Sequence, residues 1–161
     1  MPHEFRPFPG DLFARRIDAV AALVLAVLLA SPAAADEAPR PRVIVTAEQA
    51  ISWGVIGKNA AFTPTSAEVE RADAALPAFL DSSAEFGVGG VRERWPAYGR
   101  QYFGVVDSGR RVIVINAFCS HPFGDPTKEY VMVYDGGSCF FHAWYDIESG
   151  KVTGIAVNGY A

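Results

Sequence analysis

The chain has 161 residues, a formal net charge of −4 at pH 7 and a hydrophobic content of 50%. This length predicts one folded domain, and the apolar content is that of a globular protein rather than a disordered one. The acidic balance and the absence of any run of like charge argue against nucleic acid or a membrane surface as a partner.

The first segment of the chain has the pattern of a secretory signal peptide. Arg15 and Arg16 precede an apolar run from Ala19 to Ala30, and Ala33 and Ala35 follow with the spacing of a cleavage site. The apolar run is too short to span a bilayer comfortably, although an uncleaved membrane anchor is the alternative interpretation. We therefore expect a secreted or periplasmic protein that is cleaved after Ala35.

Cleavage there would divide the chain into three parts. Residues 1–35 would be the signal peptide, residues 36–42 a flexible leader and residues 43–161 a single domain. The domain opens with a short predicted strand at 43–45. Thr46 and Gln49 then have the spacing of a capping box, which predicts one or two helical turns toward Trp53.

The clearest helix follows Thr65, which forms a second capping box with Glu68. Apolar residues recur at helical spacing from there to Leu80 and form one stripe. Pro77 lacks a backbone donor, so we expect a kink or a break near Leu76. We expect residues 86–90 to be a loop. The stripe consists of Val69, Ala72, Leu76, Phe79 and Leu80.

From Gln101 onward the sequence alternates as strands do. The turn Asp107-Ser108-Gly109 predicts a hairpin, and Val106 would pair with Arg111. The turn at 135–138 predicts a second hairpin between strands at 129–134 and 139–146, in which Tyr134 would pair with Cys139. A last strand would cover residues 152–159.

These elements predict an α+β domain in which one main N-terminal helix packs on a five-stranded antiparallel sheet. The order of elements loosely resembles the layout of cystatin-like folds, which implies a sheet that wraps around a helix. The resemblance extends to the layout alone. The cystatin inhibitory pattern Q-x-V-x-G is absent, because in "QYFGV" the glycine, Gly104, comes one position early.

The predicted register divides the sheet residues between two faces. We assign the face with more β-branched and aromatic bulk, together with His142, to the core beneath the helix. It carries Phe103, Val105, Val112, Val114, Phe118, Val131, Val133, Phe140, Trp144, Ile155 and Val157.

The other face is rich in tyrosine, a residue that suits surfaces covered only when a partner arrives. We predict that it is the binding site, unless the N-terminal segment with Ile51 and Trp53 covers it. Its large residues are Tyr102, Tyr130, Met132, Tyr134, Phe141 and Tyr145.

The two cysteines, Cys119 and Cys139, predict a structural disulfide, as is usual in a small exported domain. The predicted meander argues against the bond, because it places the two residues about 15 Å apart by standard strand spacings. A disulfide requires Cα atoms within about 7 Å. The bond therefore requires the chain between them to return across the sheet, or a shift of register.

Two alternatives use the histidines as well. A zinc site could draw on Cys119, His121, Cys139 and His142, but residues three apart on a strand point to opposite faces. A cysteine nucleophile with a histidine base would make the protein a small secreted Cys/His-dependent hydrolase. An isolated histidine on a strand is more often a hydrogen-bonded core residue, so we expect no metal, no cofactor and no catalytic residue.

We therefore predict a non-catalytic exported domain that binds a partner. The partner would be another protein, an enzyme inhibited by this chain, or a second copy in a homodimer. No motif in the sequence identifies the ligand.

Overall fold

The computed structural model describes residues 40–82, 91–120 and 124–159. The predicted signal peptide, most of the leader and the predicted loop at 86–90 lie outside these ranges. Within them, no helix is long and apolar enough to cross a membrane. The elements, in chain order, are β1 (Arg42–Ile44), α1 (Ala47–Ser52), β2 (Ala61–Phe62), α2 (Ser66–Ser82), α3 (Val91–Arg94), η1 (Trp95–Ala97), β3 (Gly99–Asp107), β4 (Arg110–Phe118), η2 (Gly137–Cys139), β5 (Phe140–Asp146) and β6 (Lys151–Val157).

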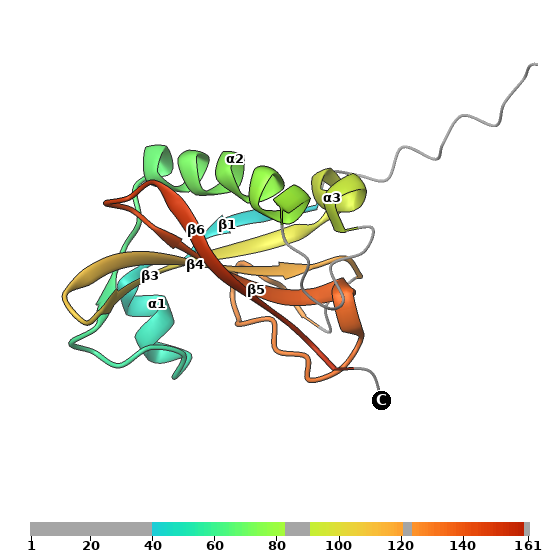
Figure 1. The fold of residues 1–161 in the computed structure, drawn as a ribbon. Helices are drawn as coiled ribbons and strands as arrows, with labels where there is room; N and C mark the ends of the chain where they lie inside the picture. Colours follow the sequence, from blue (N-terminus) through green and yellow to red (C-terminus); the bar gives the residue numbers. More distant parts are fainter. Residues whose placement is uncertain (1–39, 83–90, 121–123, 160–161) are drawn as a thin grey trace, which may run out of the picture. The chain divides into compact units, whose positions relative to one another are not determined.

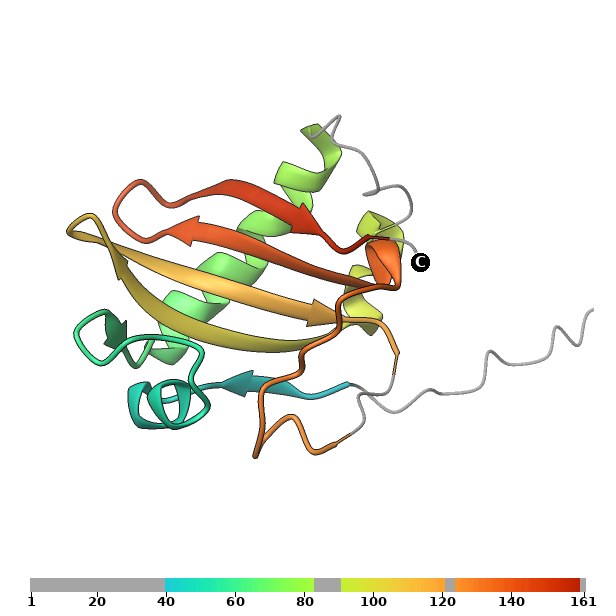
Figure 2. The same cartoon turned by 90° about the horizontal axis from the view of Figure 1, so that it is seen from below.

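These elements form an α+β fold around one six-stranded sheet (Figure 1). The strand order is β1-β3-β4-β5-β6, and β2 pairs with β3. The pairs β3–β4, β4–β5 and β5–β6 are antiparallel, whereas β1 runs parallel to β3. Helix α2 lies on one side of the sheet, which we call the helix face. Helix α1 lies on the opposite side, which we call the second face (Figure 2).

Both predicted capping boxes are present. The Thr46 hydroxyl accepts a hydrogen bond from the Gln49 backbone N–H at 3.2 Å, and the Gln49 side chain accepts one from the Thr46 N–H at 3.0 Å. At α2, Glu68 Oε2 accepts from the Thr65 N–H at 2.8 Å. These reciprocal bonds satisfy backbone donors that the first helical turn leaves free, which explains where the two helices begin.

We predicted a kink or a break near Leu76, and a break does not occur, because helix α2 continues through Pro77 to Ser82. Proline removes one backbone hydrogen bond from a helix. Leu76 and Leu80 are buried against the sheet on either side of Pro77. Packing of this apolar stripe outweighs the local preference of one residue, as is usual for helices in folded domains.

The first predicted hairpin is correct, and Val106 pairs with Arg111. Ser108 and Gly109 both adopt positive φ angles, which matches the twist of a tight hairpin turn. At the far end of this hairpin Gly99 lies beneath the ring of Phe118. A Cβ atom at Gly99 would lie 2.1 Å from Phe118 Cε2, so only glycine fits at this position.

The predicted strand at 129–134 is wrong, because these residues are not part of the sheet. Strand β4 instead pairs directly with β5, and Phe118 is opposite Phe140. The five-stranded antiparallel sheet that we expected is therefore replaced by a mixed six-stranded sheet. The residues from 124 to 135 lie on the second face, in front of the strands in Figure 2.

Two buried side-chain amides of the sheet hold this crossing segment against the second face. Gln101 Nε2 donates to the carbonyls of Pro126 at 2.8 Å and Glu129 at 2.6 Å, and its Oε1 accepts from the Val131 N–H at 3.0 Å. Asn116 Nδ2 donates to the Val131 carbonyl at 2.8 Å. These side chains satisfy backbone N–H and C=O groups of the segment that would otherwise bond to a neighbouring strand. The segment can therefore lie outside the sheet without unpaired backbone groups at these positions.

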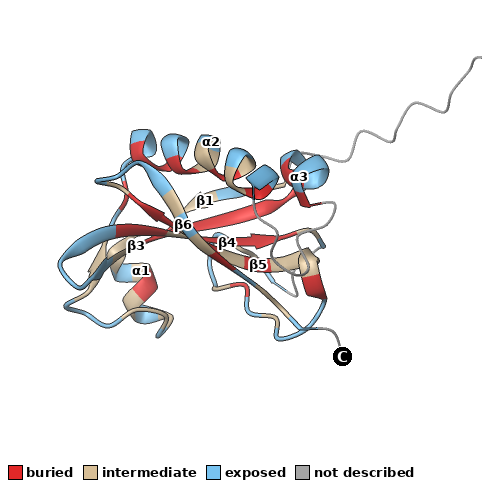
Figure 3. Ribbon diagram, in the orientation of Figure 1, coloured by how far each residue is buried: buried red, intermediate tan, exposed pale blue. Residues whose placement is uncertain are grey.

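The structure reverses our assignment of the two sheet faces on β3, β4 and β5, whereas Ile155 and Val157 of β6 lie in the core beneath α2, as predicted. Tyr102, Phe141 and Tyr145 lie in the core beneath α2, and the strands and the inner side of α2 are buried there (Figure 3). Tyrosine is tolerated in this core because its hydroxyl finds a partner, as the Tyr102 hydroxyl does in donating to Asp73 Oδ1 at 2.6 Å. The face that we expected to be core, with Phe103 and Trp144, is the second face.

Candidate functional site

The N-terminal part of the domain covers one side of the second face. Val45, Ala50 and Phe103 form a small buried cluster, against which Trp53 and neighbouring residues pack. The chain after α1 is fixed by backbone bonds, including one from the Val106 N–H to the Ala60 carbonyl at 2.7 Å. Our alternative, in which the segment with Ile51 and Trp53 covers the tyrosine-rich face, is wrong, because Trp53 packs on the side of Phe103 and Val114, the face that we assigned to the core.

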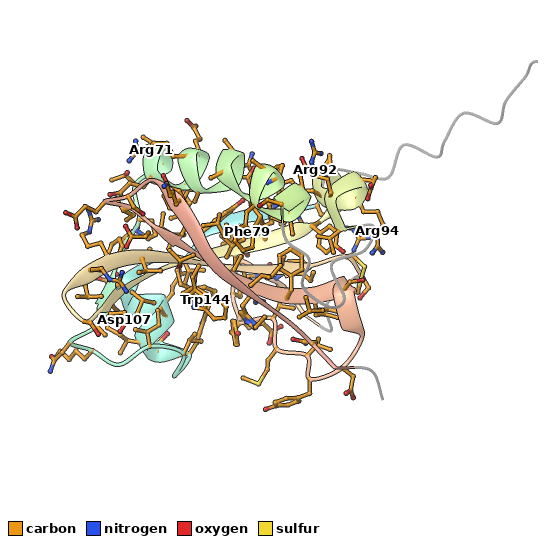
Figure 4. All side chains as sticks on the ribbon, viewed as in Figure 1. Arg71, Phe79, Arg92, Arg94, Asp107 and Trp144 are labelled. Atoms are coloured by element: carbon orange, nitrogen blue, oxygen red, sulfur yellow. A yellow bond between two sulfur atoms is a disulfide. The ribbon has the colours of Figure 1, made fainter. Side chains whose placement is uncertain are left out.

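Between this cover and the crossing segment the structure has a cavity of about 400 Å³. Its floor is formed by half-buried strand side chains, including Trp144. Figure 4 shows Trp144 on the side of the sheet opposite α2, whereas Phe79 lies between α2 and the sheet. We call it the second-face cavity. Its lining is apolar apart from one Tyr–His pair and consists of Val55, Ile56, Gly57, Ala60, Phe103, Val105, Val114, Tyr130, His142 and Trp144.

A second hollow, of about 340 Å³, adjoins this cavity and shares Val105, Val114 and Trp144 with it. Its other walls combine two valines with polar and charged side chains, and Arg110 Nη1 lies 3.7 Å from Asp146 Oδ2 there. The two hollows together form a groove along the strands. One end of the groove is apolar and aromatic, and the other is charged.

The polar group of the second-face cavity is a pair formed by Tyr130 and His142. The Tyr130 hydroxyl lies 2.7 Å from His142 Nε2, within hydrogen-bond distance. The Tyr130 ring also packs edge-on against Phe103, with ring centroids 5.5 Å apart. Burial lowers the pKa of His142 and raises the pKa of Tyr130, so both side chains are uncharged at neutral pH.

The structure does not bring the six predicted binding residues together. Tyr102, Phe141 and Tyr145 are at most 2% exposed in the helix-face core, so they offer no accessible surface. Tyr130 lines the second-face cavity. The other two, Met132 at 58% and Tyr134 at 82%, are exposed on the crossing segment.

The two cysteines lie at disulfide distance. The Cα atoms of Cys119 and Cys139 are 4.8 Å apart and the sulfur atoms 2.06 Å apart. The separation of about 15 Å that we derived assumed an intervening strand at 129–134. Because β4 pairs directly with β5, the cysteines instead lie at the ends of neighbouring strands, and the Cys119 N–H donates to the Cys139 carbonyl.

This bond bears on both alternatives that use the histidines. A zinc site and a cysteine nucleophile each require a thiolate, and the two cysteines of the chain are joined to each other. His121 lies outside the described residues. Among the residues that are described, no group of three or more His, Cys, Asp or Glu side chains is arranged to hold a metal ion.

Sequence reasoning found one wall of the cavity, Tyr130, but not the cavity itself. The signal that it missed is a pair of amides, Gln101 and Asn116, which are opposite each other on neighbouring strands. Buried amides require hydrogen-bond partners. An amide pair in the middle of a sheet therefore indicates that some further backbone crosses that face.

Comparisons with known proteins do not supply a function. No protein-family model, no curated protein and no solved structure matches the chain. The functional argument therefore rests on the geometry of the second face.

Proposed function

We propose that this chain is an exported, non-catalytic binding protein that holds a small apolar molecule in the second-face cavity. The observation that carries the proposal is the cavity itself, with about 400 Å³ of space between aromatic and aliphatic walls and one Tyr–His pair among them. Ligand pockets in proteins are typically of this size, mostly apolar, and supplied with a few polar groups that fix orientation.

Export is supported by two features of the chain. The apolar run from Ala19 to Ala30, followed by Ala33 and Ala35, has the pattern of a cleaved signal peptide. The pairing of Cys119 with Cys139 suits an oxidising compartment, where disulfides persist. An exported carrier or sensor of small molecules accounts for both features.

A neutral fluorescent probe, N-phenyl-1-naphthylamine, tests the binding proposal. Trp144 forms the floor of both hollows, so Trp144→Ala should weaken probe binding about tenfold or more by removing its largest contact surface. Tyr134→Ala is the matched control, because it also truncates an aromatic residue but one that is exposed outside the cavity. Absence of probe binding to the native protein, or equal binding to Trp144→Ala, would contradict the proposal.

The second candidate is contact with a protein partner or a second copy of the chain. It is favoured by the exposure of Met132 and Tyr134, two large side chains close together on the crossing segment. Solvent-exposed apolar residues of this kind are common at interfaces. Under this candidate, Met132→Ser with Tyr134→Ser weakens self-association in sedimentation equilibrium and leaves probe binding unchanged. An unchanged association constant would remove these residues from any dimer contact.

A further inference from the structure

The second-face cavity is built for an uncharged ligand. Among the described residues that line it, none carries a formal charge at neutral pH. The two titratable side chains, Tyr130 and His142, are held in their neutral forms by burial. An ionised group placed among these residues would lose part of its hydration without gaining a counter-charge from them, which is unfavourable.

The Tyr130–His142 pair has one hydrogen left to donate to a ligand. A neutral tyrosine and a neutral histidine together carry two hydrogens on polar atoms, and their mutual bond uses one of them. If Tyr130 donates to Nε2, the remaining hydrogen is on His142 Nδ1; if Nε2 donates, it is on the Tyr130 oxygen. His142 has no other hydrogen-bond partner in the described part of the chain. In either tautomer the pair can therefore donate to one acceptor atom.

The lining of the cavity favours rings over flexible chains. Tyr130 and Trp144 supply aromatic walls, and Val114 lies beside Trp144 on the neighbouring strand. Trp144 is only half-buried, and both hollows use it. Aromatic rings pack well against such walls at little entropic cost, because a planar molecule has few torsions to fix.

We propose that the second-face cavity binds an uncharged, ring-containing molecule whose single oxygen atom forms a hydrogen bond with the Tyr130–His142 pair. This ligand class rests on the proposed function, because it uses the same cavity. It goes further by specifying the charge, the shape and the polar contact of the ligand.

Three probes of one shape test this ligand class, namely 2-naphthol, 2-methylnaphthalene and 2-naphthoate. Binding to the native protein is followed by the indole N–H resonance of Trp144, assigned with Trp144→Phe. We expect 2-naphthol to bind at least tenfold more tightly than 2-naphthoate. This comparison needs no variant of the pair, so it stands even where a variant fails to fold.

The double variant Tyr130→Phe/His142→Phe removes both polar groups and keeps the ring walls. The affinity ratio of 2-naphthol to 2-methylnaphthalene should then fall about tenfold, which is the loss of one hydrogen bond. Tyr134→Phe, the same change at an exposed position of the crossing segment, should leave the ratio unchanged. The ratio is compared within each variant, so a general change of affinity cancels.

Two results would overturn the inference, and they differ in what else they remove. If 2-naphthoate binds as tightly as 2-naphthol, or the ratio survives the double variant, the ligand class is wrong while the cavity remains a binding site. If none of the three probes shifts the Trp144 resonance and N-phenyl-1-naphthylamine also fails to bind, both the ligand class and the proposed function are wrong.

Discussion

Replacing Gln101 with methionine should release the crossing segment from the sheet. Methionine keeps the length of the side chain but removes the amide, so the carbonyls of Pro126 and Glu129 lose a donor and the Val131 N–H loses its acceptor. Glu129 is exposed, and water can replace the lost donor at its carbonyl. Val131 is buried, and an unsatisfied buried N–H costs about 1–3 kcal/mol. When the loss of the bonds to the Pro126 and Glu129 carbonyls is added to this cost, we expect the free energy of unfolding to fall by about 2–4 kcal/mol.

Two measurements check this expectation. Urea denaturation gives the loss of stability, provided that the m-value is unchanged. Hydrogen exchange reports where the loss occurs, and the Val131 amide should exchange faster than the amides of β4. Tyr134→Ser on the same segment is the control, and its exposed position predicts a change within about 0.5 kcal/mol. If Gln101→Met leaves both stability and Val131 exchange unchanged, the amides do not hold the segment.

Three further predictions concern stability. Replacing Cys119 and Cys139 with serine should lower the free energy of unfolding in urea by about 3 kcal/mol, because the bond closes a loop with a sequence separation of 20 residues. Equal stability of the native protein with and without reductant would argue against the bond. Gly99→Ala should cost about 1–3 kcal/mol because its methyl group meets the ring above it, whereas Gly159→Ala, with open space around it, should be near neutral. Burial lowers the pKa of His142 in the folded protein, so the unfolded chain takes up a proton before the folded chain does as the pH falls below about 6.5. The free energy of unfolding should therefore decrease below this pH, and it should decrease less in His142→Phe.

Local signals in the sequence predicted much of the fold, because each depends on residues close together in the chain. The capping boxes at Thr46 and Thr65 and the turn at Ser108-Gly109 are of this kind. The strand at 129–134 was wrong because alternation shows that a segment is extended but not which groups it bonds. That error then placed the cysteines too far apart.

The sheet faces could not be assigned from residue type alone. Both faces of β4 and β5 are apolar, so alternation between polar and apolar residues does not identify the helix face. We took the tyrosines to be surface residues, yet Tyr102 is buried because Asp73 on α2 accepts its hydroxyl hydrogen. The second-face cavity depends on three segments far apart in the sequence, which no local pattern could bring together.

The most direct test of the account is to locate a bound ligand on the second face. In a complex with 2-naphthol, nuclear Overhauser effects should connect the ring protons of the ligand to the methyl groups of Val105 and Val114, the half-buried floor of the cavity. Effects to the Met132 methyl group alone would place the ligand on the exposed crossing segment, and effects to Leu76 would place it in the helix-face core. Either of these results would contradict the second-face cavity as the binding site.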